Sequence, residues 1–425
     1  MRSFHSQGAL SCFPAETNNG DVMKRTSRLL FRIFLPLALL MVVVATLFLV
    51  KGRTRVVSSE PCLVEPTESP VCDSGSVDDS AVLRALRWLK KHQHSSGCWT
   101  GGWSESGPGS DMDVAAGMTG LALLPFLAYG QTTESPEFGD TVANALSWLV
   151  ENQLEGGGWN RKYQHAIATF AMAEAYALMR IPPLRPTVER GLDIIIAGQN
   201  SQGGWRYELA PSEPSSASAS AWCCLALKAG QMAGLDRPGM EDAMRQAVEG
   251  WKTLFNESAG TGTFQYMVGN DAYPGLTGSG VYSLQLLGAA NLPETRAAVR
   301  YLVERRSGFD WENARWQDVY YWYFDTEALY HEGGTIWREW SRAFSREIYA
   351  AQRVIPFGLA DTEGRMASIG YWCKKNHRVM DTALCTLMLV WRRTLPVFDR
   401  ESAPELLESE PRDEADRTVD IIIEL

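Results

Sequence analysis

The sequence predicts an all-α protein, an (α/α)6 toroid of helical hairpins preceded by one transmembrane helix. Three observations predict it: a repeated motif in the middle of the chain, an alternation of charged and apolar helices, and an apolar run near the N-terminus. The chain has 425 residues, of which 45% are hydrophobic, so it can bury a large core without disulfides or metals. Its formal net charge of -10 argues against a nucleic-acid partner, which would require a basic face.

The first region is a predicted membrane anchor. A short tail at 1–28 precedes the anchor at 29–50, and a linker follows at 51–77. Residues 33–50 carry no charge, and as a helix with a rise of about 1.5 Å per residue they approach the thickness of the bilayer hydrocarbon. The alternatives are a buried core helix and a cleaved signal peptide, but no small-x-small cleavage site precedes Lys51. Basic residues before the run outnumber those after it, so we expect a single-pass protein with its C-terminal domain outside the cytoplasm.

The linker contains Cys62 and Cys72. In an oxidising compartment they could form a disulfide, and two free thiols are the alternative.

A repeated motif predicts the organisation of residues 78–398. Three segments read Gln-x-x-x-Gly-x-Trp, with a bulky apolar residue five positions before each glutamine. The motif residues are Gln93, Gly97, Trp99, Gln153, Gly157, Trp159, Gln199, Gly203 and Trp205. We interpret the motif as the staple of a helix–loop–helix corner: the glutamine bonds carbonyls at a helix end, the glycine permits positive φ, and the tryptophan covers the turn. Degenerate copies follow near Asn256 and Arg306, and an insertion obscures the copy that begins at Gln352.

The helices on either side of the motif alternate in character. Charged helices are predicted at 78–93, 138–153, 187–199, 240–255, 294–306 and 338–352. Apolar helices are predicted at 113–129, 165–179, 216–231, 277–289, 318–332 and 379–395. A helix that is apolar all round is buried, whereas a charged stripe marks a surface helix. Six inner parallel helices ringed by six outer ones form the toroid as a single domain.

The last region, 399–425, is an acidic tail with ten Asp or Glu residues and three Arg. Such a composition predicts a solvated segment. Its apolar end, Val-Asp-Ile-Ile-Ile-Glu-Leu, could dock on a partner or on the toroid.

The Gln-x-x-x-Gly-x-Trp repeats resemble the prenyltransferase and squalene oxidase repeat family, which includes squalene–hopene cyclases and protein prenyltransferase β-subunits. The resemblance covers about 78–398. It implies an α/α toroid, the terpenoid cyclase fold, in which known enzymes act on isoprenoids in a cavity lined by the inner helices. A single toroid with a membrane anchor is most similar to uncharacterised bacterial members of this group.

Parallel inner helices gather their N-termini at one rim, where polar residues are candidates for chemistry. The candidate catalytic residues, which include one acid further along the fifth inner helix, are Asp111, Asp113, His165, Asp318, Asp325 and Asp381. Acidic helix caps are the alternative for Asp113 and Asp318.

Two family motifs are incomplete in this sequence. The resemblance implies an Asp-x-Asp-Asp acid that protonates an alkene, but Val114 stands where the last acid would be. It also implies an Asp-x-Cys pair of zinc ligands, and no Asp-x-Cys occurs. We therefore expect no metal and no cofactor.

The predicted fifth inner helix has five consecutive aromatic residues at 320–324, flanked by Asp318 and Asp325. This wall could pack the core, stabilise a carbocation or bind a sterol-like or glycan ring. Two functions stay open: a non-catalytic binding or scaffold toroid for a lipid, peptide or glycan, and an isoprenoid or terpenoid cyclase-like enzyme that uses acids in the toroid pocket. The incomplete motifs favour the first.

Overall fold

The computed structural model describes residues 79–100, 114–159, 162–258, 261–269, 276–304, 309–360 and 366–390. The chain divides into two units, Met1–Pro70 and Val71–Leu425, and all described residues belong to the second. The predicted anchor at 29–50, the linker at 51–77 and the tail at 399–425 lie outside the described residues. Among the described residues, no helix combines the length and the apolarity needed to cross a bilayer.

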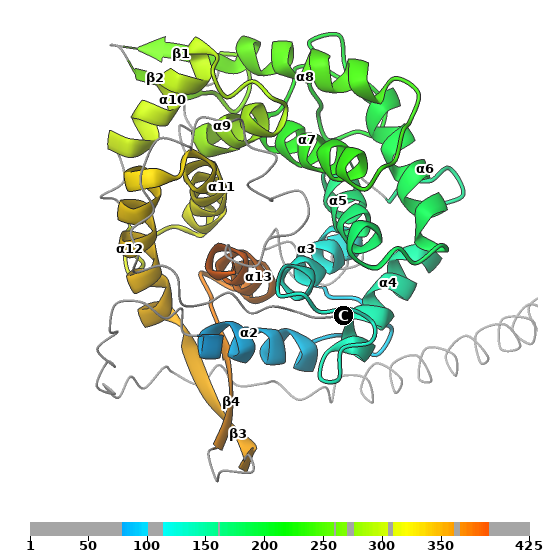
Figure 1. The fold of residues 1–425 in the computed structure, drawn as a ribbon, viewed down its shortest axis with the longest axis vertical. Helices are drawn as coiled ribbons and strands as arrows, with labels where there is room; N and C mark the ends of the chain where they lie inside the picture. The colour runs from blue at the N-terminus through cyan, green and yellow to red at the C-terminus, as the bar shows by residue number, and fades with distance from the viewer. Residues whose placement is uncertain are drawn as a thin grey trace, which may run out of the picture. The chain divides into compact units, whose positions relative to one another are not determined.

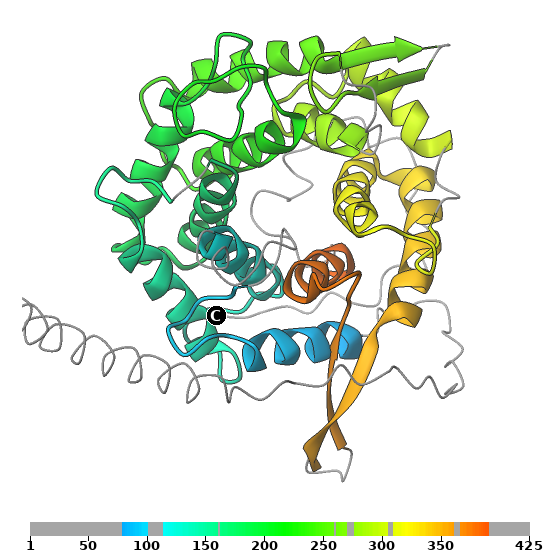
Figure 2. The ribbon, with the colours of Figure 1, turned by 180° about the vertical axis from the view of Figure 1, so that it is seen from behind.

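Helices in the described part of the chain form two nested rings (Figure 1). The inner ring contains α3 (Ala115–Ala128), α5 (Lys162–Met179), α7 (Ala217–Met232), α9 (Thr277–Leu286), α11 (Trp316–Glu332) and α13 (Arg378–Leu389). The outer ring contains α2 (Asp79–Lys91), α4 (Gly139–Glu151), α6 (Leu184–Ala197), α8 (Met240–Leu254), α10 (Pro293–Glu304) and α12 (Gly334–Ala351). The reverse view shows the same nesting (Figure 2), so the predicted toroid is confirmed.

Burial separates the two rings as the charge pattern predicts. Every residue of α3 is buried, whereas α8 buries a single stripe that includes Ala243, Ala247 and Trp251. Inner helices also approach closely: a Cβ on Gly117 of α3 would lie 2.9 Å from the Cα of Gln164 on α5. Small residues in the inner helices therefore set their spacing.

Each repeated corner joins one outer helix to the next. Gln93 Nε2 donates to the carbonyl of Gly97 at 2.8 Å and to that of Thr141 on α4 at 2.9 Å, and Trp99 Nε1 donates to the Leu89 carbonyl at 2.9 Å. The second and third corners repeat these three bonds, with the glutamines reaching Thr187 of α6 and Ala243 of α8. The motif links neighbouring repeats as well as closing its own turn.

The sixth corner closes the ring. Gln352 Nε2 donates to the Ala81 carbonyl of α2 at 2.8 Å, and Trp372 Nε1 donates to the Ile348 carbonyl at 2.7 Å. A Cβ on Gly370 would lie 2.7 Å from Gln352 Cδ, so Gly370 and Trp372 complete the motif that begins at Gln352. The last repeat thereby bonds the first helix in the way that each earlier corner bonds the next.

Two β-hairpins depart from the all-α prediction. β1 (Phe255–Ser258) pairs with β2 (Thr261–Phe264), and β3 (Arg353–Ala360) pairs with β4 (Met366–Tyr371), both antiparallel. They lie within the fourth and sixth corners. Pro356 and the irregular register between Pro356 and Ala360 break the period-two pattern that would have revealed the longer hairpin.

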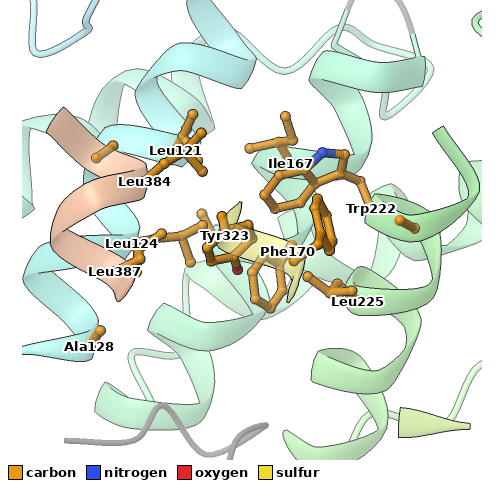
Figure 3. Packing of buried hydrophobic residues seen from close by; sticks show 14 of the residues in the cluster. Leu121, Leu124, Ala128, Ile167, Phe170, Trp222, Leu225, Tyr323, Leu384 and Leu387 are labelled. Atoms are coloured by element: carbon orange, nitrogen blue, oxygen red, sulfur yellow. The ribbon is translucent and has the colours of Figure 1, made fainter. Parts of the chain in front are cut away.

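Side chains of the inner helices meet in the middle of the ring (Figure 3). The rings of Trp222 on α7 and Tyr323 on α11 stack with centroids 6.0 Å apart, although α8, α9 and α10 separate these helices in the sequence. Leu124 of α3, Phe170 of α5 and Leu387 of α13 lie in the same cluster.

Candidate functional site

Hydroxyl groups gather where the inner helices begin. The Tyr207 hydroxyl bonds that of Tyr266, accepts from Ser216 Oγ at 3.5 Å and lies 3.5 Å from Ser218 Oγ, while the two serine oxygens are 3.1 Å apart. Ser216 is the N-cap residue of α7, and Tyr207 and Tyr266 belong to the corners that lead into α7 and α9. The corners thus bring together residues that are distant in sequence.

Two further tyrosines extend this group toward the core. Trp222 Nε1 donates to the Tyr163 hydroxyl at 3.3 Å, and the rings of Tyr163 and Tyr207 are 6.3 Å apart. Tyr320 of α11 lies beside Tyr163, and the two hydroxyls interact. We call the whole group the rim hydroxyl cluster; its members are Tyr163, Tyr207, Ser216, Ser218, Tyr266 and Tyr320.

The cluster is neutral and partly open to solvent. Burial raises the pKa of Tyr163 and of Tyr320 above the ordinary range, and burial together with the Tyr207 bond raises the pKa of Tyr266 to about 12. These three hydroxyls therefore stay protonated at neutral pH and act as hydrogen-bond donors and acceptors. Tyr163, Tyr207 and Tyr266 are half-buried, so their outer edges can reach a ligand.

His165 packs into the second corner, beside Trp159. Its Nδ1 accepts the backbone N–H of Trp159 at 3.4 Å, and its Nε2 lies 2.9 Å from the Gly191 carbonyl oxygen. In three other corners the equivalent tryptophan backbone N–H donates to a side-chain hydroxyl, that of Thr119, Ser220 or Thr382. The side chain holds the turn in place of a hydroxyl.

The candidate acids have separate surroundings. Asp318 Oδ2 accepts the backbone N–H of Arg315 at 2.7 Å and its Oδ1 pairs with that guanidinium at 3.1 Å, so Asp318 caps α11. Asp325 is half-buried and faces Gly278 of α9. Asp381 is fully buried and accepts the Lys374 backbone N–H at 2.5 Å. Asp111 and Asp113 lie outside the described residues.

Burial also changes the proton affinity of Asp381. It raises the pKa of this carboxyl to about 8, against the opposing effect of the Lys374 N–H. Asp381 therefore holds its proton at neutral pH, which suits a structural hydrogen-bonding role in the turn before α13.

Two glutamates that were not among the candidates are the most isolated acids of the described residues. Glu174 of α5 is fully buried, and neither of its carboxyl oxygens has a hydrogen-bond partner there. Burial raises its pKa well above the ordinary value, and burial raises that of Glu327 on α11 to about 8. Tyr282 and Tyr323 lie near both acids. For Glu174 the signal in the sequence was a single formal charge in the apolar stretch 165–179, whereas Glu327 is one of several acids in α11 and nothing singled it out.

Among the described residues, no group of three or more His, Cys, Asp or Glu side chains is placed to hold a metal ion.

Comparison with curated proteins finds partial similarity to triterpene cyclases. The chain is 26% identical over 136 residues to lanosterol synthase of Saccharomyces cerevisiae, and 31% identical over 94 residues to squalene–hopene cyclase of Zymomonas mobilis. The alignments cover 29% and 20% of this chain and 17% and 13% of the relatives. The chain thus spans less than a fifth of the length of the curated relatives it matches. A search of protein families found no match.

Solved structures share the fold at low identity. An inactive variant of the α-1,6-mannanase GH76A of Salegentibacter sp. HEL1_6, in complex with α-1,6-mannotetrose, has a TM-score of 0.53 at 9% identity, covering 76% of this chain and 100% of that chain. A family 76 glycoside hydrolase from a bovine Bacteroides thetaiotaomicron strain has a TM-score of 0.53 at 10% identity, covering 75% and 78%. The chain therefore has a cyclase-like α/α toroid fold that glycoside hydrolases also adopt.

Proposed function

We propose that this protein is a non-catalytic toroid that binds a neutral saccharide at the rim hydroxyl cluster. One observation carries the proposal: the hydroxyls of Tyr266, Ser216 and Ser218, from two corners, converge on Tyr207, and the Tyr207 and Tyr266 side chains are half-buried. Saccharide hydroxyls both donate and accept hydrogen bonds, as this cluster does. Tyrosine also offers a flat apolar face at low entropic cost.

Two further findings support a saccharide over an isoprenoid. The Trp222 and Tyr323 rings pack in the middle of the inner ring, which favours a shallow ligand at the rim. The fold neighbours include a mannanase whose structure contains α-1,6-mannotetrose. Asp318, two residues before Tyr320 of the cluster, is held by Arg315 as the cap of α11, which favours binding without hydrolysis.

Titration calorimetry of the full chain with α-1,6-mannotetrose, preceded by a glycan-array screen, tests this proposal. We expect Tyr207→Phe and Tyr266→Phe each to weaken binding about tenfold, because a buried hydrogen bond is lost while the ring remains. Tyr301→Phe on α10 makes the same chemical change on the outer ring and should leave affinity unchanged. Absence of saccharide binding across the array, or equal loss in all three variants, contradicts the proposal.

A second candidate is a terpenoid cyclase-like enzyme. The identity to lanosterol synthase and to squalene–hopene cyclase favours it. We infer that the acid would then come from Asp111 or Asp113. Incubation of the detergent-solubilised chain with squalene, followed by mass spectrometry, should give a cyclised product that Asp111→Asn or Asp113→Asn abolishes. If no product forms from squalene, this candidate is rejected.

We also propose that residues 29–50 anchor the chain in a membrane with the toroid outside the cytoplasm. The uncharged run at 33–50 and its basic N-terminal flank support this. Protease added to spheroplasts should digest the toroid, and protection from the protease would contradict the orientation.

A further inference from the structure

The repeat allows an internal comparison of the first turns of the inner helices. In five corners, the backbone N–H of the aromatic residue that ends the motif donates to a side chain near the start of the following inner helix. Because the same bond recurs, the acceptors occupy equivalent places in the repeat. They are Thr119 of α3, His165 of α5, Ser220 of α7, Thr277 of α9 and Thr382 of α13.

The residue immediately before each acceptor is buried, but its polarity differs between repeats. Met118, Ala219 and Leu276 stand there at α3, α7 and α9, so an apolar side chain suffices for the architecture. Asp381 stands there at α13 and accepts a backbone N–H of its own corner. At α5 the residue is Gln164, and the repeat itself does not require an amide at this place.

The Gln164 amide makes no hydrogen bond within the described residues. Its Oε1 is buried without a donor, although 8% of the residue's surface stays exposed. The corner glutamine Gln153 behaves differently, because its Nε2 donates to two carbonyls and its Oε1 accepts from Arg190. Buried polar groups in native proteins are nearly always hydrogen-bonded. The Gln164 amide is therefore open to a partner that the described part of the chain does not supply.

Gln164 lies beside the rim hydroxyl cluster. Gly117 of α3 makes room for its side chain, since a Cβ on this glycine would lie 3.0 Å from Gln164 Cγ. Tyr163, the preceding residue, accepts the Trp222 indole N–H and belongs to the cluster. Both residues are in the first turn of α5, with Cα atoms about 3.8 Å apart. A saccharide that bonds the cluster at Tyr163 can also bond the neighbouring amide.

We propose that the Gln164 amide binds two adjacent hydroxyls of the saccharide, which rests on the function proposed above. One sugar hydroxyl donates to Oε1 and its neighbour accepts from Nε2, because an amide holds an acceptor and a donor side by side. The tyrosine hydroxyls each donate or accept as the ligand demands. The amide requires a pair of adjacent hydroxyls, so Gln164 restricts the ligand to saccharides with a free vicinal diol.

Gln164→Met tests this contact with little disturbance of the fold, because methionine is similar in size and stands at the equivalent place as Met118. Titration calorimetry of the full chain with α-1,6-mannotetrose should show affinity about tenfold weaker than that of the parent. Without ligand, the urea midpoint of this variant should stay unchanged or rise, because no internal hydrogen bond is lost.

A modified ligand tests the diol directly. The methyl glycoside of the same tetrasaccharide with 3-deoxy units has no adjacent ring hydroxyls. The parent chain should bind it about tenfold more weakly than the unmodified methyl glycoside. Gln164→Met should bind the two ligands with similar affinity. Equal affinity of the parent for both ligands overturns the selection of a vicinal diol.

Two glutamines provide matched controls. Gln246→Met on the exposed face of α8 should change neither affinity nor the urea midpoint. Gln199→Met should lower the midpoint, because its amide donates to the carbonyls of Gly203 and Ala243.

The outcomes separate this inference from the function on which it rests. A lower midpoint for Gln164→Met shows that the amide is bonded within the chain and overturns the inference. Unchanged mannotetrose affinity in Gln164→Met also overturns it, while the saccharide proposal stands. If the parent chain binds no saccharide, the proposed function fails and the inference fails with it.

Discussion

Polar groups at the amino-terminal rim of the inner ring are hydrogen-bonded to one another, whereas the buried acid in the carboxyl-terminal half of α5 is not. At the rim, the Tyr207 hydroxyl has three hydroxyl neighbours, and the Tyr207 side chain is half-buried. In the other half, Glu174 is fully buried with no hydrogen-bond partner among the described residues. A satisfied network gives a fixed surface at little cost, whereas an isolated buried acid reduces stability. The comparison favours the rim as the ligand site. It also predicts that the buried acids have the largest influence on the free energy of unfolding.

Glu327 should show the largest effect, through pH. Its carboxyl pKa is raised from an ordinary 4.5 to about 8, so unfolding releases a proton between these values and stability falls as pH rises through that window. The loss amounts to about 5 kcal/mol at most. We expect Glu327→Gln to remove its share of this decline in urea unfolding measured from pH 4.5 to 9. Glu174 and Asp381, whose carboxyl pKa values burial also raises, should keep the rest of it.

The matched control for this experiment is Glu241→Gln on the exposed face of α8. It should keep the decline of the parent protein. Identical pH profiles for the parent and Glu327→Gln would show that this acid is solvated and would remove the contrast between the two halves.

Trp222 should show the next largest effect because it contacts both regions. Its indole bonds Tyr163 of the rim cluster and stacks on Tyr323 beside the acids. We expect Trp222→Ala to reduce the free energy of unfolding by about 3–5 kcal/mol, measured by urea denaturation. Trp222→Phe should lose less because it keeps an aromatic ring. A loss below that of an exposed residue such as Leu154→Ala would show that the middle of the ring is not packed.

Tyr207→Phe should show the smallest effect. Removing one hydroxyl from the rim cluster should lower the unfolding free energy by about 1 kcal/mol, because the partners can still bond each other or water. The loss should be the same at pH 5 and pH 8, in contrast with Glu327→Gln. A change that depends on pH in this range would indicate that the rim, too, contains a titrating group.

The sequence was informative about elements and much less so about contacts. The charged and apolar stripes located the helices to within a few residues, because burial requires those patterns. The longer hairpin escaped detection because Pro356 interrupts it and because Gly370 is displaced from the glutamine of its motif. The rim cluster could not be foreseen, since the hydroxyls of Tyr207 and Tyr266 meet only after two corners fold. The roles of Asp111 and Asp113 stay predictions.

The bond from Gln352 to Ala81 gives the fold a cyclic topology. A stack of repeats has two termini that can fray independently, but here the first and last repeats support each other. Inner helices end on the side of the ring where the following outer helices begin, as α5 and α6 show with four residues between them. A short linker from Leu389 to Asp79 would imitate that connection. New termini placed between α5 and α6 should then yield a circular permutant with the same twelve helices, because no corner of the ring is topologically special.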